Sequence, residues 1–327
     1  MRLNIAVVML LCCLPITVLA QSARQEKTID LPSGVSVEVS SVSPAGNLIA
    51  AICSDHVVRV WSAGSGDLVR SLQENSGLPG GLQFSNDGQL LAVSFETVKY
   101  EKGMIKVFDV ASWKVQTDLT SECMFCAIRF SPDRRRLANA GNFFGDSYVW
   151  DLATQKKVAT ISPPFGGSSA LSFSSDGKLI ATADGDGFVR IYNANTGTLR
   201  GTPTEFLLEP FAVAFSPDGK SVLAGGADKV ISVIDPENGK ISRTIPKQAG
   251  LILSFDISRD GKLTAVVYQS SQSMLDANHI MLWDLDREAV LADFQKSGIT
   301  ITGGAFVGNH YVFAAASGNQ LTLWAIP

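Results

Sequence analysis

The sequence predicts an all-β protein, a seven-bladed β-propeller with an N-terminal strand closing the last blade. One observation is a phrase close to Phe-Ser-Pro-Asp-Gly-Lys, whose serine recurs at Ser43, Ser85, Ser131, Ser174, Ser216 and Ser258, with Val307 in that slot of a degenerate seventh copy. The steps between copies are 42, 46, 43, 42, 42 and 49 residues. A second mark ends a downstream apolar run in each copy, at Trp61, Phe108, Trp150, Tyr192, Ile234, Trp283 and Trp324. A period of about 40–45 residues is typical of four-stranded propeller blades.

Each copy contains the signals of four strands. Apolar residues before the serine, such as 212–215, predict the innermost strand, and Ser-Pro-Asp-Gly predicts a tight turn because Pro presets φ and Gly accepts a positive φ. A small, apolar run such as 222–226 predicts a second strand buried on both faces. The third strand ends at the second mark, and an outer strand such as 241–245 completes the blade.

The seventh copy stops at Pro327, just after its third strand, and lacks an outer strand. The alternating segment Thr28-Ile29-Asp30-Leu31 belongs to no preceding blade. We therefore expect this segment to supply the missing strand, which removes the open sheet edges that invite aggregation.

The first residues have the pattern of an export signal. Arg2 precedes the apolar run 5–14, and Val18 and Ala20 place small residues where a signal peptidase cleaves, before Gln21. The alternative, a membrane anchor, requires a longer apolar run of about 20 residues. The expected organisation is a signal peptide at 1–20 and a propeller at 21–327, in the periplasm or outside the cell, with no membrane span. The net charge of −4 argues against nucleic acid as a partner.

The repeated phrase, the small-residue strand, and the Trp-Asp pairs at Trp150-Asp151 and Trp283-Asp284 resemble WD40 repeats. The resemblance covers nearly all of the mature chain and implies a seven-bladed propeller that serves as a non-enzymatic platform for other proteins. WD40 repeats usually carry a Gly-His pair ahead of the innermost strand, and none of His56, His279 and His310 stands there. The aspartate six residues before the second mark survives at Asp55, Asp186 and Asp228 only. The usual polar network cannot form in the usual way, so packing must carry more of the stability, and the chain is identified as a divergent, bacterial member of the family.

Three short motifs invite a chemical interpretation. Cys123 and Cys126 have redox spacing but lie between strands, which leaves two ordinary thiols, a loop disulfide or redox catalysis as the alternatives, with ordinary thiols favoured. Asp184-Gly-Asp186-Gly resembles part of a calcium loop whose closing Glu is missing, so a structural turn is favoured. Arg134-Arg135-Arg136 places Arg134 where the turn calls for Gly, and a solvated hairpin tip is favoured over a basic contact patch.

The predicted function is that of an exported, non-catalytic, protein-binding scaffold, with no catalytic residues, no cofactor and no metal. The alternative is a periplasmic propeller enzyme, such as a lactonase or a metal- or quinone-dependent hydrolase or dehydrogenase. Aromatic residues gather in the loops that join outer to inner strands and second to third strands. Because loops are normally polar, these residues predict a partner surface, with packing between blades as the alternative. The candidate partner-binding residues are Phe125, Phe143, Phe144, Phe165, Phe206 and Phe211.

Overall fold

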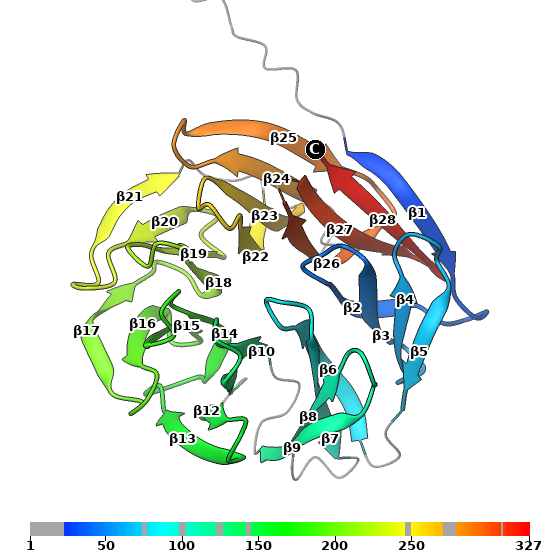
Figure 1. Cartoon of the computed structure of the whole chain (residues 1–327). Helices are drawn as coiled ribbons and strands as arrows, with labels where there is room; N and C mark the ends of the chain where they lie inside the picture. Colours follow the sequence, from blue (N-terminus) through cyan, green and yellow to red (C-terminus); the bar gives the residue numbers. More distant parts are fainter. Residues whose placement is uncertain are drawn as a thin grey trace, which may run out of the picture.

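A computed structural model describes residues 23–73, 77–97, 103–121, 127–141, 145–245, 250–270, 279–308 and 310–327. The described residues contain no helix and form seven four-stranded antiparallel sheets, which stand as blades around a common axis (Figure 1). The predicted seven-bladed all-β propeller is thereby confirmed. The expected signal peptide at 1–20 lies outside the described residues.

The strands fall into four concentric positions, and blades are numbered 1 to 7 from β2. The inner strands are β2 (Val37–Val42), β6 (Gly77–Phe84), β10 (Ile128–Phe130), β14 (Ser168–Phe173), β18 (Pro210–Phe215), β22 (Gly250–Ile257) and β26 (Thr300–Val307). The second strands are β3 (Leu48–Cys53), β7 (Leu90–Thr97), β11 (Arg136–Asn139), β15 (Leu179–Asp184), β19 (Val222–Gly226), β23 (Leu263–Ser270) and β27 (His310–Ser317). The third strands are β4 (Val58–Ser62), β8 (Gly103–Asp109), β12 (Ser147–Asp151), β16 (Phe188–Asn193), β20 (Ile231–Ile234), β24 (His279–Asp284) and β28 (Gln320–Ile326). The outer strands are β5 (Leu68–Leu72), β9 (Val115–Ser121), β13 (Lys156–Ile161), β17 (Leu199–Glu205), β21 (Ile241–Ile245), β25 (Ala289–Gln295) and β1 (Arg24–Asp30).

The recurring serine closes the turn between the inner and second strands. In blade 6 the Ser258 hydroxyl donates to Asp260 Oδ1 at 2.7 Å and accepts from the Leu263 N–H at 2.9 Å. The Asp260 carboxylate in turn accepts from the Lys262 N–H at 3.1 Å, and Gly261 has φ 75°. One serine and one aspartate thus bind the polar groups of a turn that projects into solvent, which gives a physical reason for the repeated phrase.

Arg134 takes the glycine place in the blade 3 turn and has a φ of 60°, as its position in the repeat predicts. Its guanidinium is not a free cation, because it forms an ion pair with Asp87 at 2.6 Å and donates to Gln89 Oε1 at 2.6 Å. Both partners belong to the preceding blade. The arginine therefore links blades 2 and 3, which neither the hairpin-tip nor the contact-patch interpretation of the sequence included.

The core lies between blades rather than within one. Between blades 1 and 2, for example, Ile52 and Val60 face Leu82 and Leu91 in one buried cluster. Small residues allow this approach at the tightest points. A side chain at Gly303 of blade 7 would collide with the Ser40 carbonyl oxygen of blade 1. Since each blade buries its faces only against its neighbours, the ring must be complete for every core cluster to form.

The N-terminal strand completes the ring. β1 pairs antiparallel with β28, with Thr28 opposite Thr322 and Ile29 opposite Leu321. The pairing continues past the strand end, where the Leu31 N–H donates to the Asn319 carbonyl at 2.8 Å. The predicted closing strand is confirmed, and it begins at Arg24, four residues earlier than the sequence pattern indicates.

Removing the buried side chain of the closing strand should destabilise the whole ring. Ile29 is buried in the cluster that joins blades 7 and 1, so Ile29→Ala should cost about 2–4 kcal/mol of unfolding free energy. Leu199→Ala, on the exposed face of outer strand β17, is the matched control and should cost about 0.5 kcal/mol or less. Urea unfolding measures both, and equal costs for the two variants would contradict the closure.

The serine–aspartate turns should make the fold sensitive to acid. The Ser258 hydroxyl and the Lys262 N–H hold the pKa of Asp260 below its usual range, and Ser216 and Lys220 do the same for Asp218. A lowered pKa in the folded state stabilises the protein above the ordinary aspartate pKa of about 4, and this contribution is lost as the pH falls through the folded pKa. Wild-type urea midpoints should therefore drop between pH 7 and pH 3. The double variant Ser216→Ala/Ser258→Ala should drop less, and Ser33→Ala, at an exposed position, should behave as wild type. An equal drop in the double variant would show that the turns do not carry this effect.

Candidate functional site: an apolar surface in the blade 4 loops

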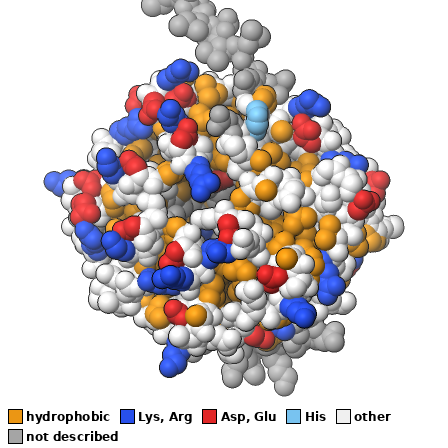
Figure 2. All heavy atoms as spheres, viewed as in Figure 1, with side chains coloured by type: hydrophobic (Ala, Val, Ile, Leu, Met, Phe, Trp, Pro, Cys, Tyr) orange, Lys and Arg blue, Asp and Glu red, His pale blue; other side chains and the backbone are white. Residues whose placement is uncertain are grey.

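The two faces of the ring carry different connections. One face, the turn face, carries the turns from inner to second strands and from third to outer strands. The opposite face, the loop face, carries the connections from second to third strands and from each outer strand to the next inner strand. This division follows from the antiparallel order of every blade. In the space-filling view, Lys and Arg side chains lie close to Asp and Glu side chains around the ring (Figure 2).

Large apolar side chains are exposed in two distinct places. One set lies on the outer strands, at the rim, and consists of Leu68, Val69, Val115, Val158, Leu199, Ile241 and Val290. Five of these, Leu68, Val115, Leu199, Ile241 and Val290, pair with the second mark of their blades, so their exposure is a property of the repeat. The other set lies in loops of the loop face and consists of Phe165 (76% exposed), Leu207 (91%) and Leu208 (51%). We refer to these three residues as the loop-face patch.

The two loops that carry the patch contact the same turn of blade 4. The Gly185 N–H donates to the Gly167 carbonyl at 3.0 Å, which joins that turn to the loop carrying Phe165. On its other side, the Phe206 N–H donates to the Gly187 carbonyl at 2.8 Å, which joins the turn to the loop carrying Leu207 and Leu208. The apolar side chains therefore flank one short turn, although more than 40 residues separate them in sequence.

Buried residues hold the loop that carries Leu207 and Leu208, and backbone hydrogen bonds hold the loop that carries Phe165. Phe206, directly before Leu207, is buried in the cluster between blades 4 and 5, and Pro210, directly after Glu209, is buried as well. The Glu209 carbonyl accepts from the Ala227 N–H at 3.0 Å. In the other loop, Gly166 and Gly167 have φ values of 79° and 61°, which only glycine adopts at no steric cost. An exposed apolar side chain on a fixed loop loses little entropy on binding a partner.

The sequence-predicted site residues that the structure describes differ in their exposure to solvent. Phe165 is exposed, so it meets the first condition for contact with a partner. Phe206 is buried between blades, so it belongs to the core and not to the expected surface. Phe211 is half-buried at the bulge of β18. Phe125, Phe143 and Phe144 lie outside the described residues, as do Cys123 and Cys126.

The sequence places Leu207 in an apolar loop of this face, but Leu207 and Leu208 are absent from the candidate partner-binding residues, which are all phenylalanines. The signal that could have found them is the run Phe206-Leu207-Leu208, which is apolar in a connection where polar residues are usual. In such a run one side chain can anchor the loop while the next two remain in water.

A buried ionic cluster supports the turn between the two loops. Arg190 donates to Asp184 Oδ2 at 2.7 Å and to both Asp186 oxygens at 2.8 and 2.7 Å. Ser168 donates to Asp184 Oδ1 at 2.7 Å. Burial raises the pKa of the Asp184 carboxyl, while the hydrogen bonds from Arg190 and Ser168 oppose that shift. The Asp-Gly-Asp-Gly motif thus holds an arginine, in agreement with its structural interpretation. It also forms a polar network in blade 4 that contains Asp186, one of the aspartates that survive in the repeats.

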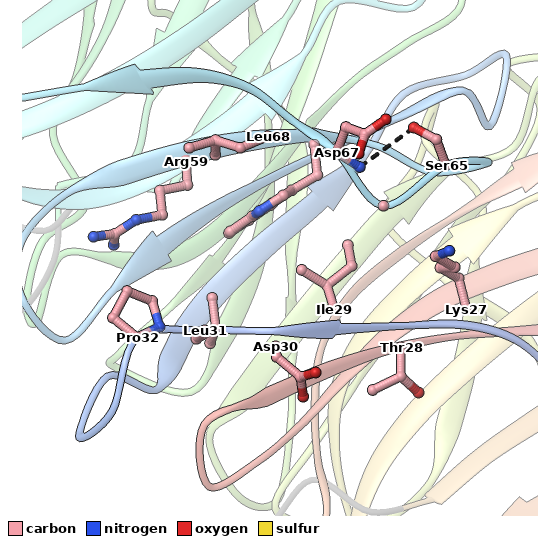
Figure 3. A pocket seen from close by; sticks show the side chains of 12 residues that line it. Lys27, Thr28, Ile29, Asp30, Leu31, Pro32, Arg59, Ser65, Asp67 and Leu68 are labelled. Carbon is pink, nitrogen blue, oxygen red and sulfur yellow. Dashed lines mark hydrogen bonds between the residues drawn. The ribbon is translucent and has the colours of Figure 1, made fainter.

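A recess lies at the rim, where the closing strand meets blade 1 (Figure 3). It has a volume of about 510 Å³ and is lined by Lys27–Pro32, Arg59, Trp61 and Ser65–Leu68. Its arginine is already bound, because Arg59 donates to the Asp55 oxygens at 2.7 and 2.6 Å. Among the described residues, no group of three His, Cys, Asp or Glu side chains has the arrangement that could hold a metal ion. Nor does the described part of the chain contain a helix with the length and apolar character needed to cross a membrane.

The fold and the repeated turn define the class of protein, a β-propeller built from four-stranded repeats. A family model for the WD domain, G-beta repeat, matches residues 28–62, 155–193 and 197–235. These matches, together with the seven four-stranded blades, support a β-propeller of the WD40 family.

Curated proteins similar to this chain come from plants, yeasts and animals. The chain is 24% identical over 269 residues to autophagy-related protein 16 of Arabidopsis thaliana, which covers 81% of this chain and 50% of the relative. It is 34% identical over 104 residues to autophagy-related protein 18 of Meyerozyma guilliermondii, covering 30% of this chain and 18% of the relative. It is 30% identical over 133 residues to human WD repeat-containing protein 55, covering 39% and 33%. The chain thus spans half or less of the length of these curated relatives.

The ionic cluster yields a stability prediction. Arg190→Met would leave Asp184, which is fully buried, without its cation, so the variant should lose about 3–5 kcal/mol of unfolding free energy. Arg59→Met in blade 1 is the matched control. Its partner Asp55 is 33% exposed and can be solvated, so the cost should be about 1 kcal/mol or less. Chemical denaturation of both variants at pH 7 measures the difference, and similar costs would mean that the buried cluster does not support the blade.

Proposed function

We propose that this WD40 propeller is an exported, non-catalytic platform that binds a partner protein through the loop-face patch. The observation that carries the proposal is the exposure of Phe165, Leu207 and Leu208 on fixed loops. An apolar side chain left in water adds nothing to folding, whereas covering one in an interface contributes about 2 kcal/mol. Family membership supports the platform role, because WD40 propellers generally act as scaffolds for other proteins.

Export outside the cytoplasm rests on the sequence pattern of residues 1–20, and bacterial origin rests on the divergence of the repeats. Both remain predictions. Mass spectrometry of the protein purified from its native cells tests the first of them, because export predicts a mature chain that begins at Gln21.

Adjacent residues give a sharp test of the binding surface. Leu207→Ser and Phe165→Ser should leave the melting temperature within about 1 °C of wild type, because both side chains are exposed. The same variants should lose the partner that chemical cross-linking in the native cells captures with wild type. Phe206→Ser, one residue away but buried, should cost about 3–5 kcal/mol of stability. Leu199→Ser at the rim is the control for a general loss of exposed apolar area.

Two results would contradict the proposal. One is a cross-linked partner that the Leu207→Ser and Phe165→Ser variants retain in full. The other is a stoichiometric metal in the purified mature protein, which would favour the propeller enzyme instead.

A further inference from the structure

Carboxylates flank the part of the loop-face patch that Leu207 and Leu208 form. Glu205 ends β17 just before the loop, and Glu209 directly follows Leu208; both are exposed. Neither forms an ion pair with any described lysine or arginine within 4 Å. Asp228 lies in the adjoining turn, which the Ala227 N–H joins to the Glu209 carbonyl, and its carboxylate accepts the Val230 N–H at 3.1 Å. Lys229, half-buried, is the cation that stands beside Asp228 in the chain.

Three exposed acidic residues on the turn face have cationic partners in an adjacent blade. Glu237 pairs with Arg200, Glu288 with Arg243 and Asp87 with Arg134, and each of these pairs joins neighbouring blades. Those carboxylates have a structural partner inside the chain. Glu205 and Glu209 have no such partner within 4 Å among the described residues, so they place negative charge beside the patch.

We infer that the loop-face patch recognises a partner segment in which apolar side chains stand next to lysines or arginines. This inference rests on the proposed function and adds the chemistry of the partner. The apolar side chains would cover Phe165, Leu207 and Leu208, and the cations would approach Glu205, Glu209 and Asp228. Complementary charge raises the association rate and rejects acidic segments, because like charges brought together cost free energy. Two fixed loops flanking one turn present a small surface, which suits a short segment better than a broad, flat interface.

A displayed library of random twelve-residue peptides tests this inference on the mature protein. Selection on wild type with counter-selection on the Phe165→Ser/Leu207→Ser double variant retains the clones that need the patch. The enriched clones should share at least one Leu, Ile, Phe or Met flanked by Lys or Arg. Enrichment of neutral or acidic clones, or no clone that depends on the patch, would overturn the inference.

Affinities of the best clone then separate charge from apolar contact. At low salt, Glu205→Gln/Glu209→Gln should weaken binding about three- to tenfold, and this loss should shrink at 0.5 M salt because exposed charges are screened. Leu207→Ser should weaken binding at least tenfold at both salt concentrations. Glu237→Gln, which removes an acid of the turn face, should leave affinity unchanged. Equal binding by wild type and the Glu→Gln double variant at low salt would refute the charge requirement.

The two proposals fail separately. If the cross-linked cellular partner depends on Leu207 while the selected peptides carry no basic residues, the platform function stands and the inferred partner chemistry falls. If basic, apolar peptides need the patch while the cellular partner ignores Leu207, the recognition chemistry stands and the assigned cellular role falls.

Discussion

The antiparallel pairing of β1 with β28 is the interaction on which the rest of the structure depends. It joins residues almost 300 positions apart, and it gives blade 7 the outer strand that the chain does not supply in sequence. Because every blade buries its faces against its neighbours, an unclosed ring would expose the clusters on both sides of the gap. The loop-face patch depends on closure only indirectly, through the rigidity of the blades that carry it.

Within the closed ring, the same hydrogen-bonded turn recurs in successive blades, whereas the side chains that pack between blades differ from one pair of blades to the next. The serine–aspartate turn recurs with nearly the same geometry from blade to blade, with hydroxyl–carboxylate distances of 2.6 to 2.7 Å in blades 2 to 6. In blade 1, Asn47 takes the role of the aspartate. Ion pairs between blades, such as that of Arg134 with Asp87, occupy different positions in different pairs of blades. The Arg190–Asp186 pair has a counterpart in the Arg59–Asp55 pair of blade 1, whereas the buried Asp184 that completes the cluster stands where blade 1 has Cys53. The cluster supports the turn that joins the two loops of the patch.

The sequence predicted what depends on repetition and missed what depends on a single loop. The number of blades and the order of their strands follow from the recurring serine and from the residue that ends each third strand, which keep a similar spacing in every copy. Ring closure follows from the outer strand that is missing in the seventh copy. None of these predictions depends on a tertiary contact. Arg134 was placed correctly at a positive φ because the turn requires it, but its ion pair depends on the distance between two blades. Phe206 and Leu207 show the limit most clearly. They are neighbours in a short connection without periodicity, and only the space between blades 4 and 5 decides that the first is buried and the second is exposed. The unpaired carboxylates beside them could not be recognised from sequence either, since pairing depends on which cations the fold brings near.

Ring closure can be tested directly by a cross-link across the β1–β28 pair. Thr28 and Thr322 are partners in the register, with hydroxyl oxygens 3.4 Å apart. The variant Thr28→Cys/Thr322→Cys should form a disulfide under mild oxidation, identified by mass spectrometry of the joined peptides, and its melting temperature should rise relative to the reduced form. Thr28→Cys paired with Gln320→Cys, which is out of register, is the control and should form little disulfide. Two free thiols in the Thr28/Thr322 variant after oxidation, with no change in melting, would contradict closure of the propeller by its N-terminal strand.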